Sequence, residues 1–293
     1  MKFKNIHFII NPISGKGKGK EVIRKIYSLF PKENIKIKIK ITQKKQDAFD
    51  FTIQSVHENA DLIVSCGGDG TLNEVASALI NQEVPLAIVP IGSGNGLARH
   101  LNISLNEEQA LQNILNSKYN IEKIDCGKIN DTYFFSNAGL GFDATVVKIY
   151  SQQKQRQFVG YLKCLFFSIF KYEPIKISVN SKSINYTGKI MMLNISNSNC
   201  MGYGFSISPK ASLQDGEFDI NLVEKCSWAM FSWIGISFLL NKKLSKKRRQ
   251  FNSSQLTIET SAKYMQIDGE YHILNSKRLQ ISLIPNSLNV LVN

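Results

Sequence analysis

The sequence has little cysteine and few long apolar runs. Its five cysteines among 293 residues are widely spaced and form no C-x-x-C pair. Neither a disulfide framework nor a zinc site is indicated, and we expect free thiols in a reducing compartment. The longest apolar run, 228–240, is shorter than the ~20 residues of a transmembrane helix. The N-terminal apolar run is too short for a signal peptide. We therefore expect a cytoplasmic protein with no transmembrane segment.

Acidic residues are also scarce. The chain has 36 lysines and arginines against 23 aspartates and glutamates, which gives a formal charge of +13. This balance favours anionic partners such as nucleic acid, phosphate-bearing ligands or an acidic membrane surface. Nucleic acid is disfavoured because no DNA- or RNA-reading motif accompanies the charge. There is no Pro- or Ser-rich linker and no internal repeat, so we expect two halves that pack closely around a cleft.

The first ~125 residues alternate strand-like and helix-like patterns, which is typical of a parallel sheet with helices on both faces. Within the helix predicted at about Glu21 to Phe30, Val22 and Ile26 share one face. A capping box, Ser104-x-x-Glu107, is predicted to open a later helix. The predicted strands are 6–10, 35–41, 61–66 and 85–90, and the other predicted helices are 47–59, 72–80 and 104–116.

Beyond about Ile124 the pattern changes to many short strands joined by turns, including 278–284 and 288–292 as separate runs. Helical patterns remain at 144–150, 160–170 and 227–240. The sequence therefore predicts an α/β nucleotide-binding domain over 1–125, followed by a β-rich sandwich domain over 126–285.

Three glycine-rich loops follow strands of the first domain. They are 11–20 (NPISGKGKGK), 66–75 (CGGDGTLNEV) and 90–99 (PIGSGNGLAR). Glycine lets a backbone approach a phosphate closely, and a following helix directs its unpaired N–H groups at the anion. None of the loops has the Walker A spacing, and none completes G-x-G-x-x-G. Three such loops at successive strand ends nevertheless favour a nucleotide phosphate site.

The motifs of these loops resemble those of the diacylglycerol kinase catalytic-domain family, including its bacterial lipid kinases and its sphingosine kinase branch. Most of the chain takes part in the resemblance. The motifs are Asn11-Pro-x-Ser-Gly15, Gly67-Gly-Asp-Gly-Thr71 with Asn73-Glu74, Gly92-Ser-Gly-Asn95 with Ala98-Arg99, Asp125-Cys-Gly127, Asn137 to Asp143, Pro209-Lys-Ala211 with Asp215-Gly216, and Asp268-Gly-Glu270.

The resemblance implies ATP-dependent phosphorylation of a lipid hydroxyl and an NAD kinase-like or diacylglycerol kinase-like fold whose last strand, about 286–293, returns to the first domain. Asp69 and Asp125 match acids that arrange a catalytic Mg²⁺, and Glu270 matches the proposed general base, so Asp69 and Glu270 would meet across the cleft. Asp215, with Ser212 and Glu217, matches a second, structural metal site. The expected nucleotide contacts are Asn11, Ser14, Gly15, Thr42, Gly67, Gly68, Gly70, Thr71, Glu74, Ser93 and Asn95.

The third loop departs from the pattern G-T-x-N-D of many diacylglycerol-type members, since Ser93 replaces the threonine and Gly96 follows Asn95. The sphingosine kinase branch also lacks that acid, so activity is still expected while diacylglycerol as the acceptor is in question. Two alternatives stay open. One is a NAD kinase-like phosphotransferase with a soluble acceptor, and the other is a catalytically silent, membrane-associated nucleotide-binding protein.

The basic run Lys242–Arg249 follows the apolar segment 228–240. It could dock the protein on the anionic inner face of a membrane, where a lipid kinase must work, or form a solvated face after a core helix. We favour peripheral membrane contact. Four aromatic residues of the preceding segment could line an acyl pocket or simply pack in a core: Trp228, Phe231, Trp233 and Phe238. Oligomeric state stays open, a homodimer included.

Overall fold

The computed structural model describes residues 3–30, 35–115, 120–153, 158–201, 204–239 and 245–292. The chain divides into two compact units. Unit 1 comprises Met1–Asp125 and Pro285–Asn293, and unit 2 comprises Cys126–Ile284. Two strands, β5 (Asn120–Ile129) and β15 (Arg278–Val292), contribute residues to both units.

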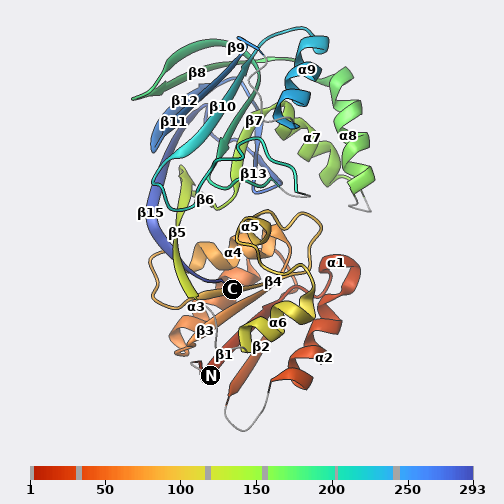
Figure 1. Cartoon of the computed structure of the whole chain (residues 1–293), viewed down its shortest axis with the longest axis vertical. Coiled ribbons are helices and arrows are strands. Elements are labelled where there is room, and N and C mark those ends of the chain that lie inside the picture. The colour runs from red at the N-terminus through yellow and green to blue at the C-terminus, as the bar shows by residue number, and fades with distance from the viewer. Residues whose placement is uncertain are drawn as a thin grey trace. The chain divides into compact units, whose positions relative to one another are not determined.

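Unit 1 is built on a parallel sheet with the strand order β2-β1-β3-β4-β15 (Figure 1). Helices connect its strands, so the predicted parallel α/β fold is confirmed. The first four strands are β1 (Asn5–Ile10), β2 (Lys36–Ile41), β3 (Leu62–Gly67) and β4 (Leu86–Pro90). The helices are α1 (Ser14–Gly17), α2 (Gly19–Leu29), α3 (Asp47–His57), α4 (Asp69–Ala78), α5 (Gly96–His100) and α6 (Glu107–Leu115).

The core of unit 1 follows the period-two pattern of its strands. Ile6 and Phe8 of β1 point to the face covered by α2, where they pack with Val22 and Ile26. The ring of Phe8 meets that of Phe30 edge to face, with centroids 5.2 Å apart. On the edge strand β2, the exposed Lys36 and Lys38 alternate with the half-buried Ile37 and Ile39, as predicted for a strand with one wet face. The pattern reverses at the end of the strand, where Lys40 is buried and Ile41 is exposed.

Two helix starts beside the glycine-rich loops differ from the prediction, and one short helix is not predicted. The sequence pattern places 11–20 in a loop, but α1 lies at Ser14–Gly17 and α2 begins at Gly19 rather than at about Glu21. Helix α4 begins at Asp69 rather than at Leu72. Glycine has low helix propensity, which hid these first turns in the sequence, and tertiary packing overrides that propensity here.

Helix α6 also has a different N-terminus from the predicted capping box. The side chain of Asn106 accepts hydrogen bonds from the backbone N–H groups of Glu108 and Gln109, both at 3.0 Å. The hydroxyl of Ser104 instead accepts the N–H of Asn106 at 3.2 Å. The cap is therefore Asn106, and α6 begins three residues later than predicted.

Unit 2 is the expected β-rich domain, with three helices on one side of its strands (Figure 1). Its strand path runs β14-β13-β7-β9-β8-β12-β15, and β10 pairs with β9 and β11. The helices are α7 (Phe142–Ser151), α8 (Phe158–Lys171) and α9 (Trp228–Leu239). The further strands are β6 (Thr132–Phe134), β7 (Asn137–Gly141), β8 (Ile175–Ser181), β9 (Asn185–Ser196), β10 (Phe218–Glu224), β11 (Arg248–Ser253), β12 (Gln255–Thr260), β13 (Tyr264–Ile267) and β14 (Glu270–Ile273).

Two strands of unit 2 differ from the prediction. In the basic run, Arg248 and Arg249 begin strand β11, which pairs with β10, and Arg248 is buried while Arg249 stays exposed, so the solvated face expected of the run does not include Arg248. The separate runs 278–284 and 288–292 form one strand, β15, which continues through Pro285. Both differences come from pairing with strands that are distant in the sequence, which no local pattern reports.

Candidate active site

The three glycine-rich loops follow β1, β3 and β4, and β3 lies between the other two strands in the sheet. The loops are therefore neighbours at one end of unit 1. The N–H of Asn11 donates to the carbonyl of Cys66 at 3.0 Å, and the N–H of Ile91 donates to the carbonyl of Gly67 at 3.0 Å. The first and third loops are thus both hydrogen-bonded to the end of β3, which is the usual ligand end of such a sheet.

The glycines of these loops allow the loops to pack on one another. A Cβ atom on Gly92 would lie 2.5 Å from the Cα atom of Gly68. Gly15 has a φ of +60°, and a Cβ atom there would lie 2.3 Å from the carbonyl oxygen of Ile91. Glycine is therefore needed at these positions because one backbone approaches another closely, and its expected role of clearing space for a phosphate stays a prediction.

Asp69, the first residue of α4, joins the second loop to the third. Its Oδ2 accepts the N–H of Asn95 at 2.9 Å and its Oδ1 accepts the N–H of Gly96 at 2.8 Å. The backbone of Asn95 adopts the left-handed conformation, with a φ of 53°, and its side chain donates to the carbonyl of Gly92 at 2.8 Å. Asp69 therefore orders the third loop with both of its carboxylate oxygens.

The start of α4 is suited to an anion. Its N-cap, Gly68, supplies no side-chain hydrogen bond to the first turn. A helix start of this kind presents N–H groups and the positive end of the helix dipole. The buried hydroxyl of Thr71 accepts from the side-chain amide of Asn11 at 3.1 Å, which ties the first loop to the same helix.

Other predicted nucleotide contacts have structural partners of their own. The carboxylate of Glu74 accepts the N–H groups of Gln46 at 3.0 Å and Ala48 at 3.2 Å, and so fixes the start of α3. Thr42 is buried, and its N–H donates to the carbonyl of Ile10 at 2.9 Å. Ser93, in contrast, is exposed in the third loop. These contacts leave Ser93 as the most accessible of the three.

Asp125 is held by a different part of unit 1. It is buried in β5, and its Oδ1 accepts the N–H of Asn286 at 2.7 Å. The segment that follows Asn286 bonds to the connection between α4 and β4, since the N–H of Asn81 donates to the carbonyl of Ser287 at 2.8 Å. The two acids predicted to share a magnesium ion are thus fixed by separate contacts, and Asn286 is a partner that the sequence did not indicate.

The lysines near the first loop are partly neutralised by α6. Lys18 and Lys25 lie 3.5 Å and 3.3 Å from the carboxylate of Glu107. Burial opposes ionisation of Glu107, but its hydrogen bonds and these two cations hold its pKa below the ordinary value. The positive charge expected of the loop is therefore smaller than the count of its lysines suggests.

In unit 2, the motif Asp268-Gly-Glu270 forms the turn between β13 and β14. Asp268 and Gly269 have φ angles of 46° and 79°. The carboxylate of Asp268 accepts three consecutive backbone N–H groups, those of Phe135 at 2.9 Å, Ser136 at 2.8 Å and Asn137 at 3.1 Å. This acid anchors the turn, and Glu270 follows it half-exposed.

A buried glutamine reinforces the same turn. Gln266 accepts the N–H of Gly269 at 3.1 Å and donates to the side-chain oxygen of Asn137 at 2.6 Å. The sequence did not indicate a role for Gln266 or for Asp268 beyond the motif. The dipeptide Asp268-Gly269 is the sequence signal that indicates a hairpin turn here, because aspartate and glycine tolerate a positive φ.

Asp143, which ends the Asn137 to Asp143 motif, lies buried near the start of α7. Burial raises the pKa of its carboxyl to about 7, although hydrogen bonds from the N–H of Ala144 and from Gln266 favour the charged form. A Cβ atom on Gly139 would lie 1.8 Å from its Oδ2, so the glycine makes room for this carboxyl.

The predicted second metal site lies on a turn of unit 2. The N–H of Glu217 donates to Asp215 at 3.2 Å, and the N–H of Gln214 donates to the hydroxyl of Ser212 at 3.2 Å. Among the residues the structure describes, no group of three acidic, histidine or cysteine side chains could hold a metal ion. A cation at Asp215 would thus depend on backbone carbonyls, a donor set that suits Ca²⁺ or Mg²⁺.

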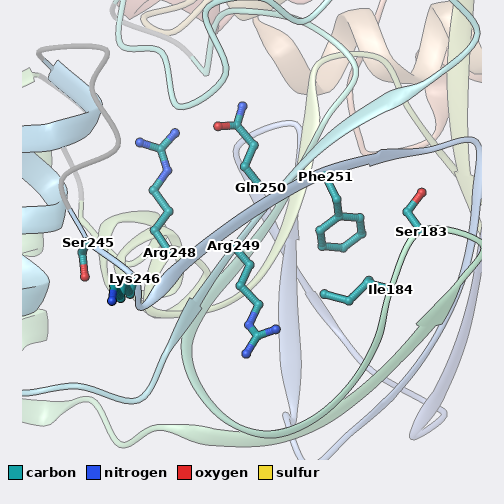
Figure 2. A pocket seen from close by; sticks show the side chains of 8 residues that line it. All are labelled: Ser183, Ile184, Ser245, Lys246, Arg248, Arg249, Gln250 and Phe251. Carbon is teal, nitrogen blue, oxygen red and sulfur yellow. The ribbon is translucent and has the colours of Figure 1, made fainter.

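The described part of the basic run makes internal contacts. The guanidinium of the buried Arg248 lies 4.0 Å from the ring centroid of Phe238 and donates to Asn221 at 3.1 Å. Arg249 leaves β11 on the opposite side and donates to Glu224 at 2.6 Å (Figure 2). These contacts contradict the hypothesis of membrane docking for Arg248. The part at 242–244 lies outside the described residues.

Figure 2 shows the pocket beside this strand, with Arg248 and Gln250 on one side of β11 and Arg249 on the other. It is lined by Ser183, Ile184, Ser245, Lys246, Arg248, Arg249, Gln250 and Phe251. None of these residues belongs to the predicted nucleotide or metal sites, although Ser245, Lys246, Arg248 and Arg249 are part of the basic run. The pocket therefore adds nothing to the nucleotide site of unit 1.

The aromatic residues considered for an acyl pocket divide into two groups. Trp228 and Phe231 pack edge to face against Phe142 of α7 in an aromatic core of unit 2. Phe238 is buried in the same core, whereas Trp233 is 51% exposed. Trp228, Phe231 and Phe238 are therefore core residues. Among the described residues, no helix is long and apolar enough to cross a membrane.

Two family models match the chain. The "Diacylglycerol kinase catalytic domain" matches residues 5–129, and the "YegS C-terminal NAD kinase beta sandwich-like domain" matches residues 136–292. The chain belongs to the diacylglycerol kinase catalytic-domain family. Its second domain is of the YegS type, and the resemblance stated from the motifs is confirmed.

Curated relatives of this family are similar over most of the chain. A diacylglycerol kinase of Staphylococcus aureus is 27% identical over 303 residues, with 97% of this chain and 94% of the relative covered. A Klebsiella pneumoniae protein named "Probable lipid kinase YegS-like" is 26% identical over 227 residues, with 75% and 76% covered.

Solved structures support the fold. A diacylglycerol kinase structure from Bacillus anthracis aligns with a TM-score of 0.74 at 21% identity, over 100% of this chain and 98% of that one. A NAD kinase from Archaeoglobus fulgidus, in complex with ATP, aligns with a TM-score of 0.52 at 12% identity, over 98% and 92%. At these identities the likeness concerns the fold alone, and it confirms the predicted NAD kinase-like architecture.

Proposed function

We propose that this chain is a lipid kinase, which transfers the γ-phosphate of ATP to the hydroxyl of a membrane lipid. The observation that carries the proposal is the junction of the three loops, in which Asp69 binds the third loop while the uncapped start of α4 stays available for phosphate. Family membership supports the reaction class, since relatives are named diacylglycerol kinase or lipid kinase.

In this proposal unit 1 binds ATP. Phosphoryl transfer needs charge neutralisation and in-line positioning more than covalent chemistry from the protein. The first-turn N–H groups of α4 would meet the phosphates, with Asn11 and Ser93 at the neighbouring loops. The remaining predicted contacts are Ser14, Gly15, Thr42, Gly67, Gly68, Gly70, Thr71, Glu74 and Asn95; among them, Thr42, Glu74 and Asn95 would act through the loop backbone that their side chains hold.

Asp69 is the residue best placed to hold a magnesium ion. It is a carboxylate at the junction of the second and third loops, and Mg²⁺ takes one or two carboxylates with several waters and phosphate oxygens. When bound, the ion would neutralise the transferred phosphate. We include Asp125 in this role on the strength of its motif, and Asp215 with Ser212 and Glu217 as a structural cation site.

Glu270 is proposed as the general base. A lipid hydroxyl is a weak nucleophile, so a carboxylate must accept or orient its proton. The turn supports this role within unit 2, because Asp268 ties it to the backbone of residues 135–137, Gln266 holds the N–H of Gly269, and Glu270 is left half-exposed. Asp268 would act as a positioning residue, without touching the substrate.

The acceptor is proposed as a glycerolipid or a sphingoid base at the inner face of the membrane. The third loop has Ser93 and Gly96 where many diacylglycerol-type members have threonine and aspartate. We therefore propose to test glycerolipids and sphingoid bases alike. The chain carries an excess of positive charge, which suits an anionic surface.

The deciding experiment is transfer of radiolabelled γ-phosphate from ATP in mixed micelles. Diacylglycerol, monoacylglycerol and a long-chain sphingoid base are offered separately, with NAD as a soluble acceptor. We expect a labelled phospholipid that depends on Mg²⁺. Labelled NADP without labelled lipid would identify a NAD kinase-like enzyme instead. ATP binding with no turnover on any acceptor would contradict the proposal and favour the silent binding protein.

A further inference from the structure

Helices α8 and α9 of unit 2 expose large apolar side chains to solvent. On α8 these include Phe166 and Phe167, each 59% exposed. On α9, Met230, Trp233 and Ile236 are exposed at a spacing of three residues, which places them along one side of the helix. Exposed aromatic residues in such numbers on two helices are unusual for a surface that meets only water.

The opposite sides of both helices are already used. Cys164 of α8 and Ile234 and Phe238 of α9 are buried in the same aromatic core, against Phe142 and Val146 of α7. The exposed side chains therefore do not belong to this core. We call the exposed apolar side chains of these two helices the α8–α9 face: Leu165, Phe166, Phe167, Met230, Trp233 and Ile236.

The charges around this face select its partner. Neither helix contains an aspartate or glutamate, and the exposed Lys163 and Lys225 lie on α8 and just before α9. Unit 2 carries 20 lysines and arginines against 10 aspartates and glutamates, so +10 of the chain's +13 lies here. A second copy of this chain docked on the same face would bring two such charges together. An anionic surface would instead be attracted to it.

We propose that the α8–α9 face docks the protein on a bilayer of anionic lipid, with its aromatic side chains inserted at the level of the headgroups. Amphipathic helices with aromatic residues on one side and flanking lysines bind bilayers in this way, through apolar burial and attraction to anionic headgroups. The inference rests on the proposed function, since a lipid acceptor lies in a membrane. In this proposal the α8–α9 face contacts the membrane instead of Arg248, because the guanidinium of Arg248 already contacts Phe238 and Asn221.

The test is flotation of the full chain with vesicles, without nucleotide. Vesicles of phosphatidylcholine with one-quarter phosphatidylglycerol are compared with pure phosphatidylcholine. The variant Phe166→Ser, Phe167→Ser, Trp233→Ser removes three apolar side chains of the face. A matched control removes three exposed apolar side chains of unit 1, through Tyr27→Ser, Ile41→Ser and Ile121→Ser. Circular dichroism and thermal melting establish that both variants remain folded.

We expect the wild type and the control to float with the anionic vesicles and to partition less with neutral ones. Partitioning of the α8–α9 variant should fall by at least ~10-fold, because apolar burial supplies much of such binding. Equal flotation of the folded variant and wild type, or no flotation of the wild type, would overturn the inference. So would light scattering that shows a wild-type dimer which the variant dissociates, since the face would then bind a second copy.

Activity separates this inference from the proposed function. Short-chain diacylglycerol dissolved as monomers is compared with long-chain diacylglycerol in the vesicles. The α8–α9 variant should keep its turnover of the dissolved acceptor and lose at least ~10-fold on vesicles. A wild type that floats but phosphorylates no lipid would refute the kinase and leave the docking face standing. Equal loss on both acceptors would refute a docking role.

Discussion

At the scale of single residues, Asp69 and Asp268 share a property that their motifs do not display. Each is followed by glycine, and each carboxylate accepts backbone N–H groups from a segment distant in the sequence. Charge-assisted bonds of this kind are stronger than neutral ones. These acids therefore hold the loops on which the proposed chemistry depends.

Asp69→Asn is expected to lower kcat by at least ~100-fold while the protein stays folded. The amide would have only one acceptor oxygen, so the N–H of Asn95 or of Gly96 would lose its partner and the third loop would loosen. Steady-state kinetics with a melting curve checks this. The control is Asp50→Asn, on an exposed position of α3. An unchanged kcat would remove Asp69 from the mechanism.

The turn of unit 2 predicts different kinetics for Asp268 and Glu270. Glu270→Gln removes the proposed base and should lower kcat by at least ~100-fold. Asp268→Asn should lower kcat by about 10- to 100-fold through misplacement of Glu270. KM for ATP should change little in both, and steady-state kinetics measures these effects. If Asp268→Asn left kcat unchanged, its role would not be one of positioning.

Asp143 predicts a dependence of stability on pH. The pKa of its carboxyl is about 7 in the folded protein, against 3.8 ordinarily. The unfolded chain thus releases this proton as pH rises above 4, while the folded chain keeps it until about 7. Its contribution to the free energy of unfolding should fall by about 4 kcal/mol across that range. Urea unfolding of Asp143→Asn should show a stability advantage over the wild type that grows from pH 4 to pH 7; parallel curves would contradict this.

At the scale of elements, periodicity predicted most helices and strands, and the errors fall at their ends. Burial patterns such as that of β1 arise from neighbours in the sequence, so they can be read locally. The starts of α1, α4 and α6 depend instead on glycine-rich turns and on which side chain reaches the free N–H groups. In each case several residues could cap the free N–H groups of the first turn, and only the folded structure shows which one does.

Helix α6 tests this selection. Asn106→Ala should lower the free energy of unfolding by about 1 kcal/mol, because the N–H groups of Glu108 and Gln109 lose their acceptor. Ser104→Ala is the matched change at the cap that the sequence predicted, and it should cost less. Denaturant melts of both variants give the comparison. A larger loss for Ser104→Ala would restore the capping box.

At the scale of the whole molecule, the last residues of the chain belong to the first unit. Leu288 and Val290 are almost fully buried, and Val290 pairs with Leu86 of β4. The side chain of Asn289 donates to the carbonyls of Gln82 and Glu83 at 3.2 Å and 3.3 Å. Unit 1 is therefore incomplete without the segment 285–292, which follows unit 2 in the sequence.

Leu288→Ala is expected to destabilise the protein by about 2–5 kcal/mol through the cavity it leaves. Because the segment also supplies Asn286, which binds Asp125, ATP affinity should fall although the change lies far from the loops in the sequence. Calorimetric melting and nucleotide titration measure the two effects. Leu105→Ala, at an exposed position, is the control. If neither the melting temperature nor the affinity for ATP fell, the segment would be dispensable for unit 1.

The sequence by itself determined the two-part architecture, the order of most elements and the family, because these depend on local periodicity and on short motifs. Only the tertiary structure decided what Arg248, Asp125 and the loop glycines contact. Arg248 looked like part of a solvated or membrane-facing run until β11 paired with β10 and turned its side chain towards Phe238. The physical reason is that such partners come from distant positions, and folding alone brings them within bonding distance.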